Sequence, residues 1–223
     1  MVVRAHRIIA TGAHRNESDV MTVYVESNFV LEQSLEQEEG ESCAEVIELA
    51  SNGRITLAVP AFSLAEPHVA IMGKEKARSR LSNDLRRHLF ELGRSKQHRE
   101  VPATFEALAS VLIASAQIER EGLRSTISEL LRTADVIALD AAILRSAAAI
   151  EVEYGMSGQD AIVLASVLAH IEVHNPLESC FLNRNSKDFD DPDIRERLDA
   201  RGCKFFSNFG DGLRYILSRI EKN

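Results

Sequence analysis

A small set of acidic and amide side chains in this sequence could hold a divalent cation. Each lies at the end of an expected strand, on the helix that follows a strand, or near the start of a helix. Carboxylate and amide oxygens, without His or Cys, select hard cations such as Mg²⁺ or Mn²⁺. Two such ions about 4 Å apart can activate a water and stabilise the leaving oxygen of a phosphodiester. The set is Glu26, Glu66, Asp160, Asn185 and Asp188.

These side chains are far apart in the sequence, but one type of fold would bring them together. In an open parallel sheet, ligands bind beyond the carboxyl ends of the strands. Glu26 directly follows the apolar segment 22–25, and Asn185 and Asp188 come shortly after the apolar pair 181–182. Carboxylates that converge in a partly dry site raise one another's pKa unless a cation compensates their charge. We therefore expect a metal site at one edge of the sheet.

Each acid also has a simpler interpretation, which the sequence leaves open. Glu26 could end a strand ahead of a turn. Glu66 precedes Pro67, which disfavours helical geometry at Glu66, so this acid could only mark a kink. Ser157 and Asp160 form an acidic version of a capping box, and an acid in the first turn suits the helix dipole. Their joint occurrence at one sheet edge favours the metal site.

Motifs for other chemistries are missing from the sequence. His170 and His174 are four residues apart, but Ile171 stands where the HExxH motif of zinc proteases requires Glu. No GxSxG motif of a serine hydrolase occurs, and the segment beginning at Gly73 lacks the upstream glycine of a phosphate-binding loop.

Strand and helix patterns alternate along the chain, which predicts an α/β sandwich around a mainly parallel sheet. Strands are predicted at 23–25, 54–60, 135–139, 180–185 and 203–206. Helices are predicted at 29–50 with an interruption near Gly40, and at 61–72, 103–121, 123–133, 140–154, 156–174 and 211–220. We expect Gly122 to separate two helices, and the acids of the first helix, among them Glu32 and Glu39, to form a solvated face.

The stretch from Gly73 to Arg99 is strongly basic, with nine Lys and Arg residues against three acids. Four leucines recur in it at helical spacing, which predicts a helix with one apolar edge and one cationic face. A cationic face of this kind is commonly only solvated, but it could also contact phosphates. The best candidates for phosphate contacts are Arg78, Arg80, Arg86 and Arg87.

Four segments in the same order resemble the conserved segments of PIN-domain proteins, the family of VapC-type toxins and other metal-dependent ribonucleases. They read VYVESN…VL, LAVPAFSLAE, MSGQDAIVLASVLAH and FLNRNSKDF. The resemblance runs from about Met21 to Leu217 and implies a three-layer α/β sandwich with a mainly parallel central sheet. It implies one PIN-like domain at 21–223 with a helical, basic insert at about 73–121.

The resemblance also implies an activity, the cleavage of single-stranded RNA with Mg²⁺ or Mn²⁺. Carried over by position, the metal-binding set is Glu26, Glu66, Asp160, Asn185 and Asp188. The four acids of this set, which are all its members except Asn185, are the catalytic residues. Ser27 and Asn28 stand where the family has a small hydroxyl residue and Asn, and are expected to contact substrate. A water attacks the phosphate, and no side chain acts as a covalent nucleophile.

One departure from the family pattern concerns the first acid, which is normally Asp and here is Glu26. Because Mg²⁺ demands near-ideal octahedral geometry, the longer side chain could reduce activity or shift it toward Mn²⁺. The departure keeps open a second function, a PIN-fold module that binds RNA or a protein without cleaving. A Mg²⁺-dependent phosphatase is a third, but the sequence after the first strand offers no DxD nucleophile.

Composition adds limits on compartment and partners. A formal net charge of −8 gives no overall attraction to nucleic acid, so contacts must come from a local basic patch or a bound cation. Three widely spaced cysteines without a CxxC pair, and no apolar run near 18 residues, predict a cytoplasmic protein that does not enter a membrane. Residues 1–20 are expected to be a loosely attached extension, not a signal peptide. The expected partners are an RNA substrate, an antitoxin protein and a second copy in a homodimer.

Overall fold

The computed structural model describes residues 20–98 and 101–221, with the backbone alone at 98 and 101–109. Its five strands form one sheet in the order β3-β2-β1-β4-β5, and every neighbouring pair is parallel. The strands are β1 (Thr22–Val25), β2 (Thr56–Pro60), β3 (Ala134–Ile137), β4 (Ser179–Leu182) and β5 (Cys203–Phe206). The predicted sandwich with a parallel central sheet is confirmed. The predicted extension at 1–20 lies outside the described residues except for its last position.

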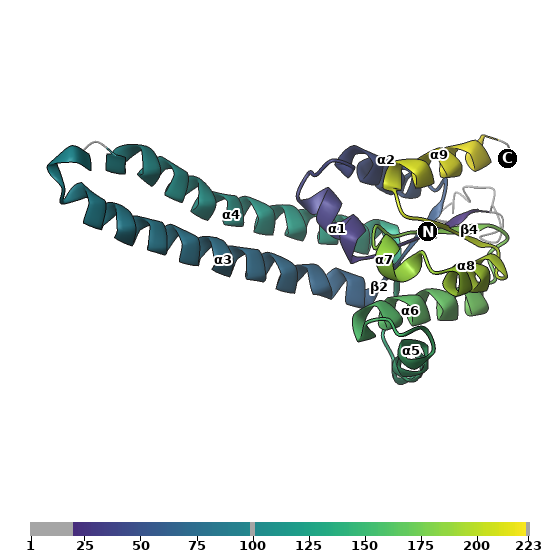
Figure 1. Cartoon of the computed structure of the whole chain (residues 1–223). Helices are drawn as coiled ribbons and strands as arrows, with labels where there is room; N and C mark the ends of the chain where they lie inside the picture. Colours follow the sequence, from purple (N-terminus) through teal and green to yellow (C-terminus); the bar gives the residue numbers. More distant parts are fainter. Residues whose placement is uncertain (1–19, 99–100, 222–223) are drawn as a thin grey trace, which may run out of the picture.

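Helices cover both faces of the sheet and enclose two cores (Figure 1). Because successive strand residues point to opposite faces, Val23 and Val25 lie in one core and Tyr24 in the other. The first core is covered by α1 (Ser27–Ser34), α2 (Gly40–Ser51) and α9 (Phe209–Ile220). The second is covered by α5 (Ala141–Tyr154), α6 (Gly158–His174), α7 (Ser186–Phe189) and α8 (Pro192–Asp199). The result is the expected three layers.

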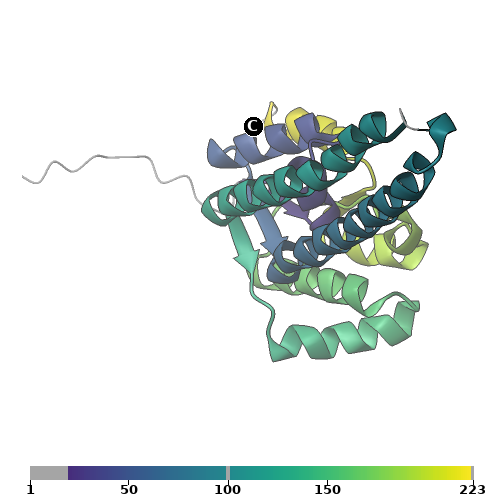
Figure 2. The same cartoon turned by 90° about the vertical axis from the view of Figure 1, so that its left-hand side faces the viewer.

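Two long antiparallel helices, α3 (Ala61–Gly93) and α4 (Val101–Thr133), join β2 to β3 and project far from the sheet (Figures 1 and 2). A short 3₁₀ turn at Lys96–His98 lies near their tip. Only the ends nearest the sheet contribute to its core, through residues such as Ile71 and Leu123. No described side chain from 72 to 122 belongs to either core. We call residues 72–122 the arm; it contains the predicted basic insert.

The predicted helix at 61–72 continues to Gly93, and the predicted break at Gly122 is wrong. Helix α3 continues through Pro67, and it does so because Leu64 and Ile71, one turn to either side, are both buried in the core and hold the helix there. Helix α4 continues through Gly122, where a Cβ atom would collide with the backbone carbonyl oxygen of Ser34 in α1. The glycine allows two backbones to approach and does not end a helix.

Smaller differences concern element ends. The interruption predicted near Gly40 is present, and it is the turn at 35–39, just before that residue. The predicted strand at 180–185 ends at Leu182, so that the polar residues after it form a turn. Helix α8 is not anticipated from periodicity, although Asp191 caps it and Pro192 starts it. Within the described ranges, no helix is long and apolar enough to cross a membrane.

Candidate metal and nucleic-acid site

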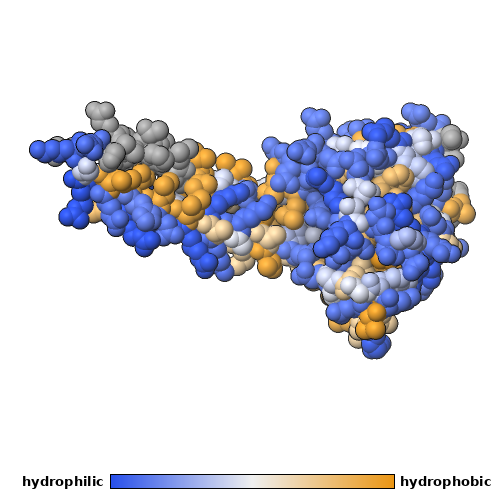
Figure 3. Space-filling model, viewed as in Figure 1, coloured by the Kyte–Doolittle hydropathy of each residue, from blue (hydrophilic) through white to orange (hydrophobic). Residues whose placement is uncertain are grey.

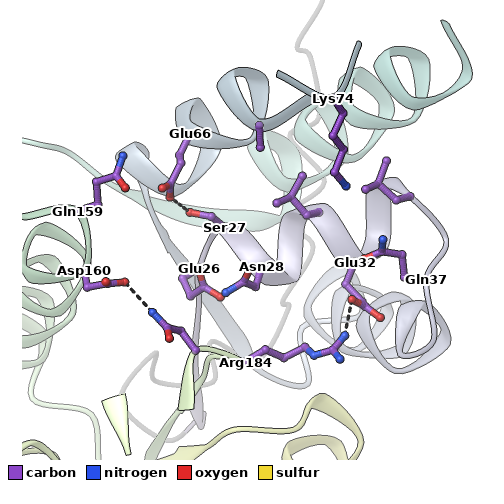
Figure 4. A pocket seen from close by; sticks show the side chains of 14 residues that line it. Glu26, Ser27, Asn28, Glu32, Gln37, Glu66, Lys74, Gln159, Asp160 and Arg184 are labelled. Carbon is purple, nitrogen blue, oxygen red and sulfur yellow. Dashed lines mark hydrogen bonds and ion pairs between the residues drawn. The ribbon is translucent and has the colours of Figure 1, made fainter. Parts of the chain in front are cut away.

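An open cavity lies at the carboxyl end of β1, where the sequence predicts the metal site. Its volume is about 600 Å³, and α1, α3, α6 and the turn after β4 contribute its walls (Figure 4). The cavity brings together residues from all four segments of the predicted site. Six predicted site residues line it: Glu26, Ser27, Asn28, Glu66, Asp160 and Asn185.

Glu26 is a deeply buried acid of this cavity that has no ion-pair partner among the described residues. It is the N-cap residue of α1 and only 5% exposed, and its Oε1 atom has no hydrogen-bond partner within the described structure. Burial raises the pKa of this carboxyl to about 8, and the nearby charges of Glu66 and Asp160 add to the rise. Hydrogen bonds from Asn28 oppose it. A buried carboxyl of this kind needs either a proton or a cation.

Glu66 reaches the cavity from the second turn of α3. Its Oε2 atom accepts a hydrogen bond from the hydroxyl group of Ser27, the first residue of α1 (Figure 4). Glu66 lies on a continuous helix, as predicted, although it precedes Pro67. The helix points this acid at the start of α1.

Asp160 is both a capping residue and a cavity residue. Its backbone N–H donates to Ser157 Oγ at 3.1 Å, and that hydroxyl donates to Asp160 Oδ2 at 2.6 Å. The amide Nδ2 of Asn185 donates to Asp160 Oδ1 at 3.1 Å and to Asp188 Oδ2 at 2.9 Å. These bonds fix the direction of the Asp160 carboxylate. Asp188 does not line the cavity, and its hydrogen bond with Asn185 links it to the lining.

The predicted phosphate-binding arginines lie on the arm and do not line the cavity. The guanidinium group of Arg78 forms an ion pair with Glu119 at 2.7 Å and donates to Ser115 Oγ at 3.0 Å, which ties α3 to α4. Arg87 pairs with Asp84 at 3.1 Å on the same helix. The side chains of Arg80 and Arg86 are exposed.

Sequence reasoning missed an ion-pair network at the opposite end of the cavity. Glu32 is only 2% exposed, and its Oε2 atom accepts from Arg184 Nη1 at 2.6 Å. Arg184 Nε also lies 3.6 Å from Glu39 Oε2, and the Glu39 carboxylate accepts from the first backbone N–H groups of α9. The expected solvated face is therefore wrong for Glu32. Glu32 is four residues after Asn28, so helical spacing places both on the same face of α1, and this spacing could have predicted that Glu32 faces the cavity.

Three further polar residues of the lining were not predicted as site residues: Lys74, Gln37 and Gln159. Lys74 extends from α3 toward the cavity on the side away from Asp160 and Gln159 (Figure 4). Its position follows from helical spacing, because Glu66, Ala70 and Lys74 are four residues apart and all three line the cavity.

The chemistry of the lining fits a hard divalent cation. The candidate ligands are oxygens of acids and an amide, and the unpaired oxygen of Glu26 is a buried group that such an ion would satisfy. In the side-chain conformations of the described residues, no three His, Cys, Asp or Glu groups form a ready metal cluster. The assignment of these residues to a metal therefore depends on their common cavity.

A family model and, distantly, a solved structure are similar to this chain. A family model described as a PIN domain matches residues 23–189. No curated protein matches the chain. Among solved structures, that of VapBC2 from Rickettsia felis bound to a DNA fragment from its promoter covers 83% of this chain and 99% of its own. The sequence identity is 13% and the TM-score 0.42, and a likeness this distant carries no argument about activity.

Proposed function

The chain belongs to the PIN-domain family, and from this membership we propose that it is a divalent-metal-dependent endoribonuclease that cleaves single-stranded RNA. PIN domains are generally nucleases that use divalent metal ions. The observation that carries the proposal is that Glu26, Glu66, Asp160 and Asn185, from four separate segments, line one cavity.

The metal-binding role falls to Glu26, Glu66 and Asp160. Asn185 and Asp188 complete the metal-binding set, and the side-chain amide of Asn185 donates a hydrogen bond to the carboxylate of Asp188. When bound, Mg²⁺ or Mn²⁺ would activate the attacking water and neutralise charge on the leaving oxygen. The protein contributes the positions of the acids. Loss of a residue that hydrogen-bonds a metal ligand typically lowers metal affinity or activity 10- to 100-fold.

Each acid is oriented by a partner from this chain. Ser27 binds the carboxylate of Glu66, and Asn28 favours the ionised form of Glu26. Ser157 and Asn185 hold the two oxygens of Asp160. Ser27 and Asn28 therefore have positioning roles in addition to the substrate contact that the sequence predicts for them.

The decisive test compares two Asp-to-Asn variants on a mixed single-stranded RNA with Mg²⁺ or Mn²⁺. Asp160→Asn should lower kcat/KM by about 100-fold or more, because it removes a ligand charge. Asp140→Asn is the matched control: Asp140 caps α5 away from the cavity, and Asn caps a helix equally well. Its activity should stay within about twofold of wild type. Metal-independent cleavage, or equal activity of both variants, would overturn the proposal.

A second function is favoured by one observation, the burial and raised pKa of Glu26. With a pKa of about 8, this carboxyl holds its proton at neutral pH when no metal is bound, which weakens metal binding. The alternative is a PIN-fold module that binds RNA or a protein without cleaving it. Glu26→Asp separates the two: an inactive wild type with an active Asp variant supports the module, whereas an active wild type supports the nuclease.

The proposal extends to a toxin of a toxin–antitoxin pair, with an antitoxin protein as partner and a homodimer as the assembly. Induced expression in bacterial cells should then arrest growth for the wild type and not for Asp160→Asn. Continued growth with soluble, RNA-cleaving wild-type protein would remove the toxin role and leave the nuclease role intact.

A further inference from the structure

The cavity has a cationic part that the metal-binding set does not use. Lys74 and Arg184 line the same cavity as the acids, and both lie away from Asp160 (Figure 4). Arg184 is already neutralised, since Glu32 binds one of its nitrogens at 2.6 Å and Glu39 lies 3.6 Å from another. Its charge serves to pair α1 with the turn after β4.

Lys74 differs from Arg184 and Arg78 because its amine is not held by an acid. Within the described part of the chain, Lys74 forms no ion pair within 4.0 Å, whereas Arg78, one turn further along α3, pairs with Glu119. The side chain extends toward the cavity from the helix that also carries Glu66 (Figure 4). An ammonium group that reaches the cavity without an acidic partner is available to an anionic ligand.

The spacing on α3 indicates which anion this would be. Glu66 and Lys74 are two turns apart, about 12 Å along the helix axis. Lys74 also lies on the side of the cavity away from Asp160 (Figure 4), so its amine is better placed for a neighbouring phosphate than for the scissile one. A strand whose scissile phosphate lies at the acids therefore presents a different phosphate to Lys74.

We propose that Lys74 binds a phosphate of the RNA strand other than the one that is cleaved, so that the substrate spans the cavity from the acids to the base of the arm. The inference rests on the proposed nuclease function and adds a substrate requirement to it: an RNA with more than one phosphate. Because the acids crowd the other end, this contact also gives the anionic strand a favourable point of attachment.

The test uses two substrates, a dinucleotide with a single phosphodiester and a longer single-stranded oligonucleotide, with Mn²⁺ present. Lys74→Met keeps the apolar stem and removes the charge, and should lower kcat/KM on the oligonucleotide about tenfold. On the dinucleotide it should change kcat/KM by no more than about twofold. Lys74→Arg should restore most of the activity on the oligonucleotide.

Lys76→Met is the matched control, because Lys76 is exposed, lies about 200° around α3 from Lys74 and does not line the cavity. It should leave both substrates unaffected. In the Asp160→Asn background, where cleavage is removed, Lys74→Met should also lower the slope of log affinity against log salt for the oligonucleotide by about 0.7.

Four outcomes would overturn the inference. Equal losses on both substrates would place Lys74 at the scissile phosphate, and equal effects of Lys74→Met and Lys76→Met would make it one of many surface charges. A wild-type protein that neither binds nor cleaves RNA would overturn both this inference and the proposed function. Metal-dependent cleavage that Lys74→Met leaves unchanged would overturn this inference alone.

Discussion

At the scale of single residues, Glu26 connects the metal site to pH. Its side chain is 5% exposed, one of its oxygens is unpaired, and burial together with two neighbouring acids raises its pKa to about 8. A metal ion must therefore displace a proton from Glu26 at neutral pH, since only the ionised carboxylate is a good ligand. The ionised form is fully populated only above pH 8.

We predict that the affinity for Mn²⁺ rises about tenfold per pH unit between pH 6 and 8 and levels off above, because one proton is released. Calorimetric titration at several pH values measures this. Glu26→Gln should bind more weakly and lose this pH dependence. An affinity of the wild type that stays constant from pH 6 to 8 would contradict the prediction.

Glu26 should also make the metal-free protein less stable as pH rises. The folded state keeps this proton up to about pH 8, whereas the unfolded chain releases it near the ordinary Glu pKa of about 4.3. The unfolding free energy contributed by this group therefore falls as pH rises from about 4.3 to 8. We expect Glu26→Gln to raise the melting temperature at pH 8 in a chelator and to have less effect at pH 4.5.

The predictability of the site differs among its residues for a physical reason. Glu26, Asp160 and Asn185 occur at strand ends or in a first helical turn, so topology alone brings them together. Glu32 and Arg184 were missed because their ion pair joins residues 152 positions apart, and local sequence does not reveal such a contact. A capping box and a ligand were offered as rival interpretations of Asp160; its capping bonds are present and it also lines the cavity.

At the scale of elements, the packing of α1 against α4 determines the position of the helix that carries part of the site. Gly122 in α4 packs against the backbone of Ser34 at the end of α1. The same helix α1 carries Ser27, Asn28 and Glu32 into the cavity. Local propensity treats a helical glycine as a break, but close packing of two backbones selects it.

Two helix-interior glycines should respond to alanine in opposite directions. Gly122→Ala should destabilise the protein by about 1–3 kcal/mol, because the added methyl group collides with a backbone oxygen. Gly73→Ala in α3 meets no atom within 4 Å and should stabilise by about 0.5–1 kcal/mol through helix propensity. Denaturant unfolding of both variants checks the pair. Two shifts of the same sign would contradict the assigned packing.

At the scale of the whole molecule, the arm is structurally separate from the cores. Its described side chains take no part in them, and Leu89 and Ser82 are buried away from the sheet. Several large apolar side chains of the arm are exposed, among them Phe90 at 75% and Ile118 at 69%. Figure 3 shows orange, hydrophobic areas along the projecting arm. The arm also differs from the rest of the chain in charge: residues 73–99 are strongly basic, whereas the chain as a whole has a net charge of −8.

Shortening the arm should therefore affect RNA binding more than stability. We predict that replacing residues 81–114 with a short Gly/Ser loop changes the melting temperature little, because no residue of either core is removed. In the Asp160→Asn background, the same deletion should weaken RNA binding and flatten its salt dependence, since it removes Arg86 and Arg87. Unchanged RNA affinity would mean that the cationic face is only solvated.

The insertion point of the arm has a consequence for how the chain folds. Strands β2 and β3 are neighbours in the sheet, yet the whole stretch 61–133 separates them. Bringing the ends of so long a loop together would carry a large entropic cost if it were a flexible coil. Contacts between α3 and α4, such as the ion pair of Arg78 with Glu119, hold the two helices antiparallel, so a hairpin that forms first would bring Pro60 and Ala134 toward each other. The helical hairpin thus turns a distant strand pairing into a nearly local one, which favours faster folding than the sequence separation implies.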